Sequence, residues 1–434
     1  MTKTNRLLIV TYYWPPSGGA GVQRILKFTK YLPDFGIEPI VLTVKNPTYP
    51  IIDKSLEEEV PNGLKVFKTR SFEPYQLYAK IAGKSADEVA KPTSEISSNK
   101  STLGKLAAWI RANFFIPDAR VGWQITARKK AAKLIDKYNI KTVLTTGTPH
   151  SAHFTGLSLK KKYPITWIAD FRDPWSQIHY NQHLPRTTSA ARIDRKLEQH
   201  VLETADEVLV VSPSMAGLQS SIFDRSYHVV PNGFDPVDFQ QDASQKNQNE
   251  QFTIRYVGSL SETMIPVAFM KALGALKKHS DLAFRMEFTG NVHPKVEQLI
   301  AAHQLEDCVT INGYKPHHEA VQLMKGADLL LVLIPDVKHN ELILTGKLFD
   351  YMAAKQPILL LGPPAGDAAQ IIDELNCGAS VPFSDYHQIY DTLKNAIQNH
   401  PKPFVTIPEF TLHDHPYSRI SLTKQLAQII TDKQ

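Results

Sequence analysis

The 434-residue chain has little of what defines several specialised classes of protein. It contains only 2 cysteines, Cys308 and Cys377, which cannot build a disulfide framework, so we expect a reducing compartment. The longest apolar run, Leu329–Ile334, is far shorter than the roughly 20 residues of a membrane-spanning helix. The apolar segment Leu7–Val10 soon meets Pro15-Pro16 and is too short for a signal-peptide core. These absences favour a cytoplasmic protein.

Familiar ligand motifs are also missing. No G-x-x-x-x-G-K-[ST] pattern occurs, which argues against a P-loop nucleotide site. The histidines of His317-His318 and His413-Asp414-His415 lack further metal ligands close by in sequence. We therefore expect no metal site and no bound cofactor.

What the chain does have is an ordinary globular composition with an uneven distribution of charge. Hydrophobic residues make up 42% and charged residues 21%, as in folded soluble domains. Residues 1–200 contain 31 Lys and Arg against 16 Asp and Glu, whereas residues 201–434 contain 18 against 27. All 5 tryptophans lie in the basic part. This asymmetry predicts two domains, the first of which faces an anionic partner such as membrane headgroups, a lipid-linked phosphate or nucleic acid.

Short apolar segments alternate with helical patterns along most of the chain. The segments that we expect to form strands are Arg6–Tyr12, Pro39–Val44, Lys141–Thr146, Ile165–Phe171, Glu207–Ser212, Phe252–Val257, Phe284–Thr289, Asp328–Ile334 and Pro357–Leu361. This alternation predicts an α/β fold with two Rossmann-like domains, whose parallel sheets face each other across a cleft. A polar stretch over Asp242–Gln251, in which Ala243 is the one aliphatic residue, interrupts this alternation. The predicted division is an N-terminal domain over 1–235, a linker over 236–251, a C-terminal domain over 252–412 and a C-terminal helix over 413–434. We expect that helix to pack back towards the N-terminal domain.

Four segments at predicted strand ends carry the residues that suggest chemistry. Pro15–Arg24 joins the first strand to a helix, and its glycines allow close approach of an anionic ligand. Thr148–His153 follows another strand and contains His150. Ala169–Trp175 places two carboxylates, a guanidinium and an indole directly after a buried strand. Leu344–Met352 opens a helix with Thr345 as N-cap, Lys347 as a cation for a diphosphate and Asp350 for ribose hydroxyls. Each segment also has a purely structural interpretation as a turn, an internal salt bridge or a capped helix.

Taken in order, these segments resemble the two-domain GT-B glycosyltransferases, close to the retaining family 4 and its bacterial cell-surface polysaccharide members. The residues that carry the resemblance are Tyr13–Gly19 with Val22–Arg24, Asp170–Trp175, Val229–Asp235, Tyr256–Leu260 and Thr345–Tyr351. The resemblance implies that the C-terminal domain binds a nucleotide-diphosphate sugar and the N-terminal domain binds a glycan or a polyprenyl-diphosphate-linked acceptor. It also implies metal-independent transfer, which agrees with the absence of any Asp-x-Asp motif.

The resemblance assigns candidate residues. The catalytic candidates are Asp170, Arg172, Asp173 and His150. The donor-binding candidates are Gly18, Gly19, Arg24, Gly258, Ser259, Thr345, Gly346, Lys347 and Asp350. The chain departs from the family pattern at Leu342, where a glutamate is expected, and at Ser259 and Ile265, where basic residues are expected.

Other functions remain open at this point. A nucleotide-sugar epimerase has the same fold, and a non-catalytic partner subunit would explain the departures. Nucleic-acid binding is disfavoured, because the basic residues are dispersed and form no recognised motif.

The basic part of the chain also contains an amphipathic helical pattern. Leu103, Leu106, Ala107, Ile110 and Phe114 form one helical stripe. Lys100, Lys105 and Arg111 flank the stripe, and Trp109 is close by. This pattern predicts either peripheral binding at the inner face of the cell membrane or packing of the stripe on the N-terminal sheet.

Overall fold

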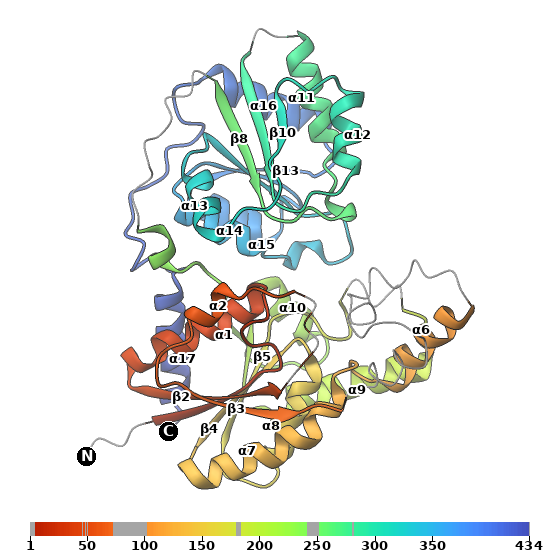
Figure 1. The fold of residues 1–434 in the computed structure, drawn as a ribbon, viewed down its shortest axis with the longest axis vertical. Coiled ribbons are helices and arrows are strands. Elements are labelled where there is room, and N and C mark those ends of the chain that lie inside the picture. The colour runs from red at the N-terminus through yellow and green to blue at the C-terminus, as the bar shows by residue number, and fades with distance from the viewer. Residues whose placement is uncertain are drawn as a thin grey trace. The chain divides into compact units, whose positions relative to one another are not determined.

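The computed structural model describes residues 5–45, 47, 49, 51–72, 102–178, 184–240, 251–279 and 282–433. The chain divides into two compact units, unit 1 (Met1–Asn232 and Arg419–Gln434) and unit 2 (Gly233–Ser418). Each unit contains one parallel sheet with helices (Figure 1). The predicted α/β fold with two Rossmann-like domains is confirmed.

The sheet of unit 1 has 7 strands in the order β3-β2-β1-β4-β5-β6-β7. They are β1 (Asn5–Val10), β2 (Ile37–Lys45), β3 (Lys65–Arg70), β4 (Thr142–Gly147), β5 (Thr166–Phe171), β6 (Glu207–Val210) and β7 (His228–Val229). Successive residues of β1 are buried on opposite faces of this sheet. Leu7 and Ile9 belong to one apolar cluster, and Leu8 and Val10 belong to the other. The sheet is therefore covered on both faces, as its nearly continuous apolar strands require.

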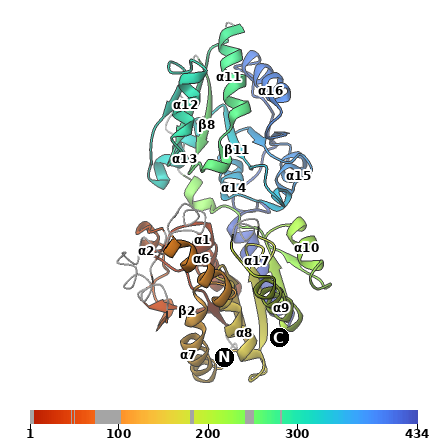
Figure 2. The same cartoon turned by 90° about the vertical axis from the view of Figure 1, so that its right-hand side faces the viewer.

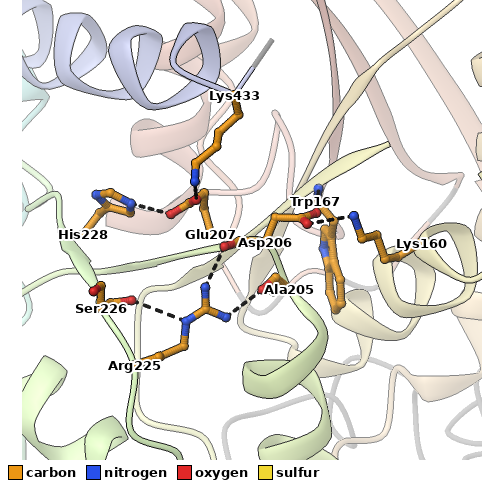
Figure 3. Close-up of polar contacts among 9 residues, drawn as sticks. All are labelled: Lys160, Trp167, Ala205, Asp206, Glu207, Arg225, Ser226, His228 and Lys433. Atoms are coloured by element: carbon orange, nitrogen blue, oxygen red, sulfur yellow. Dashed lines mark hydrogen bonds and ion pairs between the residues drawn. The ribbon is translucent and has the colours of Figure 1, made fainter. Parts of the chain in front are cut away.

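Figure 2 shows the helices of unit 1, some of which cover the two faces of the sheet. They are α1 (Ala20–Tyr31), α2 (Ser55–Glu58), α6 (Thr102–Phe114), α7 (Gln124–Tyr138), α8 (His153–Lys160), α9 (Thr188–Thr204), α10 (Pro213–Ser220) and α17 (Arg419–Thr431). Helices α1 and α17 contribute to the cluster of Leu7 and Ile9, and α7 contributes to the other.

The sheet of unit 2 has 6 strands in the order β10-β9-β8-β11-β12-β13. They are β8 (Phe252–Val257), β9 (Phe284–Thr289), β10 (Val309–Ile311), β11 (Leu329–Leu333), β12 (Ile358–Leu361) and β13 (Gly378–Val381). The helices are α11 (Val267–His279), α12 (Lys295–Ala302), α13 (His317–Lys325), α14 (Gly346–Ala353), α15 (Asp367–Glu374) and α16 (Tyr386–Gln398). Two apolar clusters again lie on opposite faces of the strands.

Unit 2 begins at Gly233, slightly before the start of the linker predicted over 236–251. Pro236–Phe239, at the start of the predicted 236–251 segment, form a 3-10 turn, and Phe239 is buried in a core cluster of unit 2. Residues 241–250 lie outside the described part of the chain. Helix α17 belongs to unit 1, where Leu422, Leu426 and Ile430 are buried with the residues of α1.

Candidate functional sites in the two units

Each sheet reverses its strand order at one point, and the predicted ligand loops follow the strands at that point. In unit 1 the reversal lies between β1 and β4, and in unit 2 between β8 and β11. The two neighbouring strands are parallel, but the chain leaves them towards opposite edges of the sheet. The loops at their carboxyl ends therefore diverge and leave room for a ligand. The loop after β1 leads to Gly18 and Gly19, and the loop after β4 contains His150. In unit 2, Gly258 follows β8, and α14 follows β11.

A buried ion pair lies at the centre of the unit 1 site. Arg24 is 1% exposed and Asp170 is 0% exposed. The Arg24 guanidinium donates to Asp170 Oδ1 at 2.9 Å and to the Pro231 carbonyl at 2.6 Å. Thr146 donates to Asp170 Oδ2 at 2.8 Å. Both charges are therefore paired inside unit 1, which fixes α1 against β5 and leaves no exposed surface on Asp170 for a substrate.

Arg172 does not pair with Asp170 but binds backbone carbonyls. Its guanidinium donates to Gly147 O at 2.8 Å and to Thr148 O at 2.7 Å. A Cβ built on Gly21 would lie 1.0 Å from an Arg172 nitrogen, so any larger residue at the start of α1 would force the guanidinium to move. The neighbouring Asp173 is exposed and accepts a hydrogen bond from the Thr148 hydroxyl at 2.6 Å.

His150 is buried in a stack of rings. It is 6% exposed and lies parallel to Trp175, with ring centroids 5.1 Å apart. His153 stacks on Phe171 at 4.6 Å. Desolvation lowers the pKa of His150 to about 4, partly opposed by Asp173, and it lowers the pKa of His153 as well. Both imidazoles are therefore neutral at pH 7.

Two acids that the sequence analysis did not select support this site, the half-buried Asp118 and the buried Asp194. Asp118 accepts from the Ser151 amide and hydroxyl, both at 2.8 Å, which fixes the loop that carries His150. Asp194 on α9 accepts from Trp175 Nε1 at 2.7 Å. Burial raises the pKa of both carboxyl groups. Neither acid lies in a recognisable motif, so only the fold reveals their roles.

In unit 2, glycine allows a lysine to reach the end of β8. Gly258 has φ +134, and a Cβ there would lie 2.2 Å from Lys347 Cε. The Lys347 ammonium lies 5.3 Å from the centre of the Tyr256 ring, and the Tyr256 hydroxyl donates to the Ser259 carbonyl at 2.7 Å. Desolvation lowers the pKa of Lys347, and Asp350 acts in the opposite direction. Gly258, Ser259 and Lys347 are thus brought together.

The N-terminus of helix α14 lies near Gly258, at the end of β8. The Tyr351 hydroxyl accepts from the Val257 amide at 2.8 Å, which fixes the helix to the end of β8. Thr345 precedes the helix, but its hydroxyl makes no cap hydrogen bond and has no partner in the structure. Unpaired amides near Gly346, the positive end of the helix dipole and the Lys347 charge together suit an anion. Asp350 lies one turn further along.

The described residues contain no group of three or more His, Cys, Asp or Glu side chains that could hold a metal ion. Within the same residues, no helix combines the length and apolar character needed to cross a bilayer.

Comparison with known proteins agrees with this architecture. Residues 92–238, about a third of the chain, match the family model described as Glycosyltransferase Family 4. Anabaena HepE in complex with UDP and glucose is similar over 99% of this chain and 100% of its own, with 14% identity and a TM-score of 0.62. The chain has the GT-B fold. The predicted resemblance to family 4 glycosyltransferases is confirmed.

Solved structures of proteins with other described activities are also similar to the chain. Sucrose-phosphate synthase from Thermosynechococcus elongatus is 14% identical, covers 99% of both chains and has a TM-score of 0.64. A putative UDP-N-acetylglucosamine 2-epimerase from Listeria monocytogenes is 10% identical, with coverage of 99% and 97% and a TM-score of 0.57. No curated protein sequence matches the chain.

Proposed function

We propose that the protein is a glycosyltransferase that takes a sugar from a UDP-sugar or a related nucleotide-diphosphate sugar. The observation that carries this proposal is the start of α14, where Lys347 meets Gly258 at the end of β8. The resemblance to family 4 and to HepE, whose structure contains UDP and glucose, supports the same donor class.

The donor diphosphate would bind at the N-terminus of α14. The amides at Gly346 and Lys347 and the Lys347 ammonium would offset the negative charge that grows on the diphosphate as its bond to the sugar breaks. The glycine at 258 lets the phosphates approach the backbone. Asp350, one turn into α14, would accept hydrogen bonds from the ribose hydroxyls. This arrangement needs no bound metal and no other cofactor.

Transfer would retain the configuration at the anomeric carbon. The acceptor hydroxyl would attack from the face that the diphosphate leaves, and a departing phosphate oxygen would take its proton. No enzymic nucleophile is required in this scheme. It therefore fits a unit 1 whose buried carboxylate, Asp170, already has Arg24 and Thr146 as partners.

The acceptor would bind to unit 1. Arg172 and the exposed Asp173 are the groups best placed to contact it, and His150 and Asp170 would hold their loops. The excess of positive charge in residues 1–200 favours an anionic acceptor, such as a glycan on a polyprenyl diphosphate. We propose a role in cell-surface polysaccharide synthesis, with the protein in the cytoplasm and peripherally bound at the inner face of the cell membrane.

The test is to measure UDP binding by calorimetry and then to screen nucleotide sugars for hydrolysis and transfer. Asp350→Ala removes the acceptor for the ribose hydroxyls, keeps a good helix former in α14 and should weaken UDP binding several-fold. Asp391→Ala, at an exposed aspartate of helix α16, is the matched control and should bind as wild type does. Wild type that fails to bind UDP or any other nucleoside diphosphate would contradict the proposal.

An epimerase is the second candidate, because the structural neighbours include UDP-N-acetylglucosamine 2-epimerase. The two candidates differ in product. A transferase releases UDP and forms a glycoside, whereas an epimerase interconverts two UDP-sugars and leaves the diphosphate attached. A chain that binds UDP but does neither would be the non-catalytic partner suggested by Leu342, Ser259 and Ile265.

A further inference from the structure

Helix α6 exposes apolar side chains to solvent. Leu106 is 52% exposed, Trp109 40%, Ile110 41% and Phe114 69%, whereas Ala112 on the other side of the helix is 3% exposed. The stripe predicted from the sequence therefore does not pack on the sheet at its described members, and that alternative is wrong for them. The side chains of Leu103 and Ala107, and residue Lys100, lie outside the described part of the chain.

The outward orientation of α6 is held by specific hydrogen bonds. The Asn113 side chain donates to Pro185 O at 2.8 Å and accepts from the Thr187 amide at 2.7 Å. Thr187 is the N-cap of α9, so α6 is fastened to the start of that helix. Arg186 also donates to the Pro117 carbonyl at 3.1 Å. The exposed face is thus a fixed feature of unit 1.

Helix α9, which is joined to α6 through Thr187 and Asn113, exposes positive charge on unit 1. On α9, Arg192, Arg195 and Lys196 are exposed. Two acids of that helix point inward, with Asp194 1% and Glu198 0% exposed, and the exposed acid Glu203 lies at the far end of the helix. Lys105 on α6 is exposed, and so is Ile193 on α9. Exposed apolar side chains on α6, together with exposed cations on α6 and α9, complement an anionic lipid surface.

The same part of the chain is joined to the loops of the candidate site. Asp118, four residues after the end of α6, binds the Ser151 amide and hydroxyl next to His150. Asp194 of α9 binds Trp175, which stacks on His150. These contacts link α6 and α9 to the loops of unit 1 that we propose to receive the acceptor. A surface that binds the two helices would therefore lie next to those loops.

We propose that the exposed face of α6, with the cations of α9, docks on an anionic lipid bilayer. Leu106, Trp109, Ile110 and Phe114 enter the headgroup layer, and Arg192, Lys196 and Lys105 contact the lipid phosphates. This face of unit 1 would be the part of the protein that contacts the membrane in the proposed peripheral localisation. The inference rests on the proposed function only for the lipid-linked acceptor, because binding to the bilayer needs no nucleotide.

Tryptophan fluorescence with brominated lipids tests the contact directly. Of the 5 tryptophans, all within the described residues, only Trp109 is more than 3% exposed. Vesicles of phosphatidylglycerol and phosphatidylcholine with brominated chains should quench the emission of Trp109. In Trp109→Phe this quenching should disappear while co-sedimentation with the vesicles persists. Binding without quenching in wild type would overturn the assignment of this face.

Charge reversal tests the role of α9. Arg192→Glu with Lys196→Glu should weaken binding to vesicles by about twentyfold or more, since each cation near an anionic surface adds roughly a fivefold factor. The matched control is Lys278→Glu with Lys295→Glu, which removes two exposed cations from unit 2. Wild-type binding should fall as salt rises. Equal loss in both double variants would show nonspecific attraction and overturn the proposal.

Two further outcomes separate this proposal from its alternatives. If wild type stays in the supernatant with anionic vesicles at low salt, the docking proposal is wrong, whereas UDP binding tests the donor site independently. If wild type ignores vesicles but self-associates, and Phe114→Ser makes it monomeric, the face binds a second copy and the lipid assignment falls. UDP affinity should be unchanged in every α6 and α9 variant.

Discussion

Units 1 and 2 share a sheet topology, but they use polar residues at their strand ends differently. In unit 1, Asp170 is 0% exposed and has Arg24 and Thr146 as partners. In unit 2, the Lys347 ammonium lies over a tyrosine ring, and the Thr345 hydroxyl has no partner. The difference suggests that motif residues of unit 1 mainly stabilise the fold, whereas those of unit 2 mainly bind the ligand. Substitutions can separate these roles.

The strongest test is Asp170→Ala, which strands the buried Arg24 charge. Breaking a buried ion pair by removing one partner costs about 3–5 kcal/mol. All tryptophans lie in unit 1, so the urea transition followed by their fluorescence reports this unit. Arg24→Met with Asp170→Leu removes both charges and should lose much less stability. If Asp170→Ala unfolds like wild type but abolishes turnover, Asp170 is catalytic and the comparison fails.

Acid should destabilise unit 1 through His150. Burial lowers its pKa to about 4 from 6.5, so the unfolded state takes up the proton first as pH falls. Stability should therefore decline between about pH 6.5 and 4, by about 3 kcal/mol over the whole range. His150→Phe keeps a ring against Trp175 and should flatten this part of the pH profile. An unchanged profile in that variant would rule His150 out as the cause.

Lys347→Met should show the opposite pattern from Asp170→Ala. Losing a charge-assisted hydrogen bond to a phosphate costs about 1.5–3 kcal/mol, so UDP affinity should fall roughly 10- to 100-fold. Stability should hold or rise, because desolvation already disfavours the charged amine. Calorimetry with UDP measures the first effect and thermal unfolding without ligand the second. Lys295→Met, at an exposed site of unit 2, is the control.

A pair of threonines gives the smallest and most closely matched contrast. Thr146→Val removes a hydrogen bond to Asp170 in unit 1 and should cost about 1–2 kcal/mol of stability. Thr345→Val removes an unpartnered hydroxyl at the start of α14 and should leave stability within about 0.5 kcal/mol. UDP affinity should fall a few-fold only in the second variant. Similar stability losses in both would erase the proposed difference between the units.

The sequence was sufficient for most of the fold because the central strands are apolar and of typical length. Segments such as Phe252–Val257 and Phe284–Thr289 match β8 and β9. The strands that were not predicted lie towards the edges of the sheets or are very short. β3 is half-exposed, β7 has two residues and β10 has three. Such strands form because they hydrogen-bond to the backbone of a neighbouring strand, and the local sequence contains no signal of that neighbour.

The candidate sites were only partly predictable. The sequence predicted that Lys347 and Gly258 belong to one donor-binding site, since each lies in a motif at the end of a strand. It gave no indication that Asp170 pairs with Arg24, 146 residues away in sequence. Asp118 and Asp194 were missed for the same reason, because their partners come from distant segments. Whether Asp170, Arg172, Asp173 and His150 act in catalysis stays a prediction.

The return of α17 to unit 1 has a consequence for synthesis on the ribosome. Leu422, Leu426 and Ile430 complete an apolar cluster with Leu7, Ile9 and residues of α1. The ribosome makes all of unit 2 between these segments, and N-terminal domains generally begin to fold during synthesis at about 5–20 residues per second. For roughly 10–40 s after residue 232 is made, one apolar face of unit 1 therefore lacks its cover. A nascent chain stalled before Arg419 should bind chaperones through that face, and release of the full chain should end the interaction.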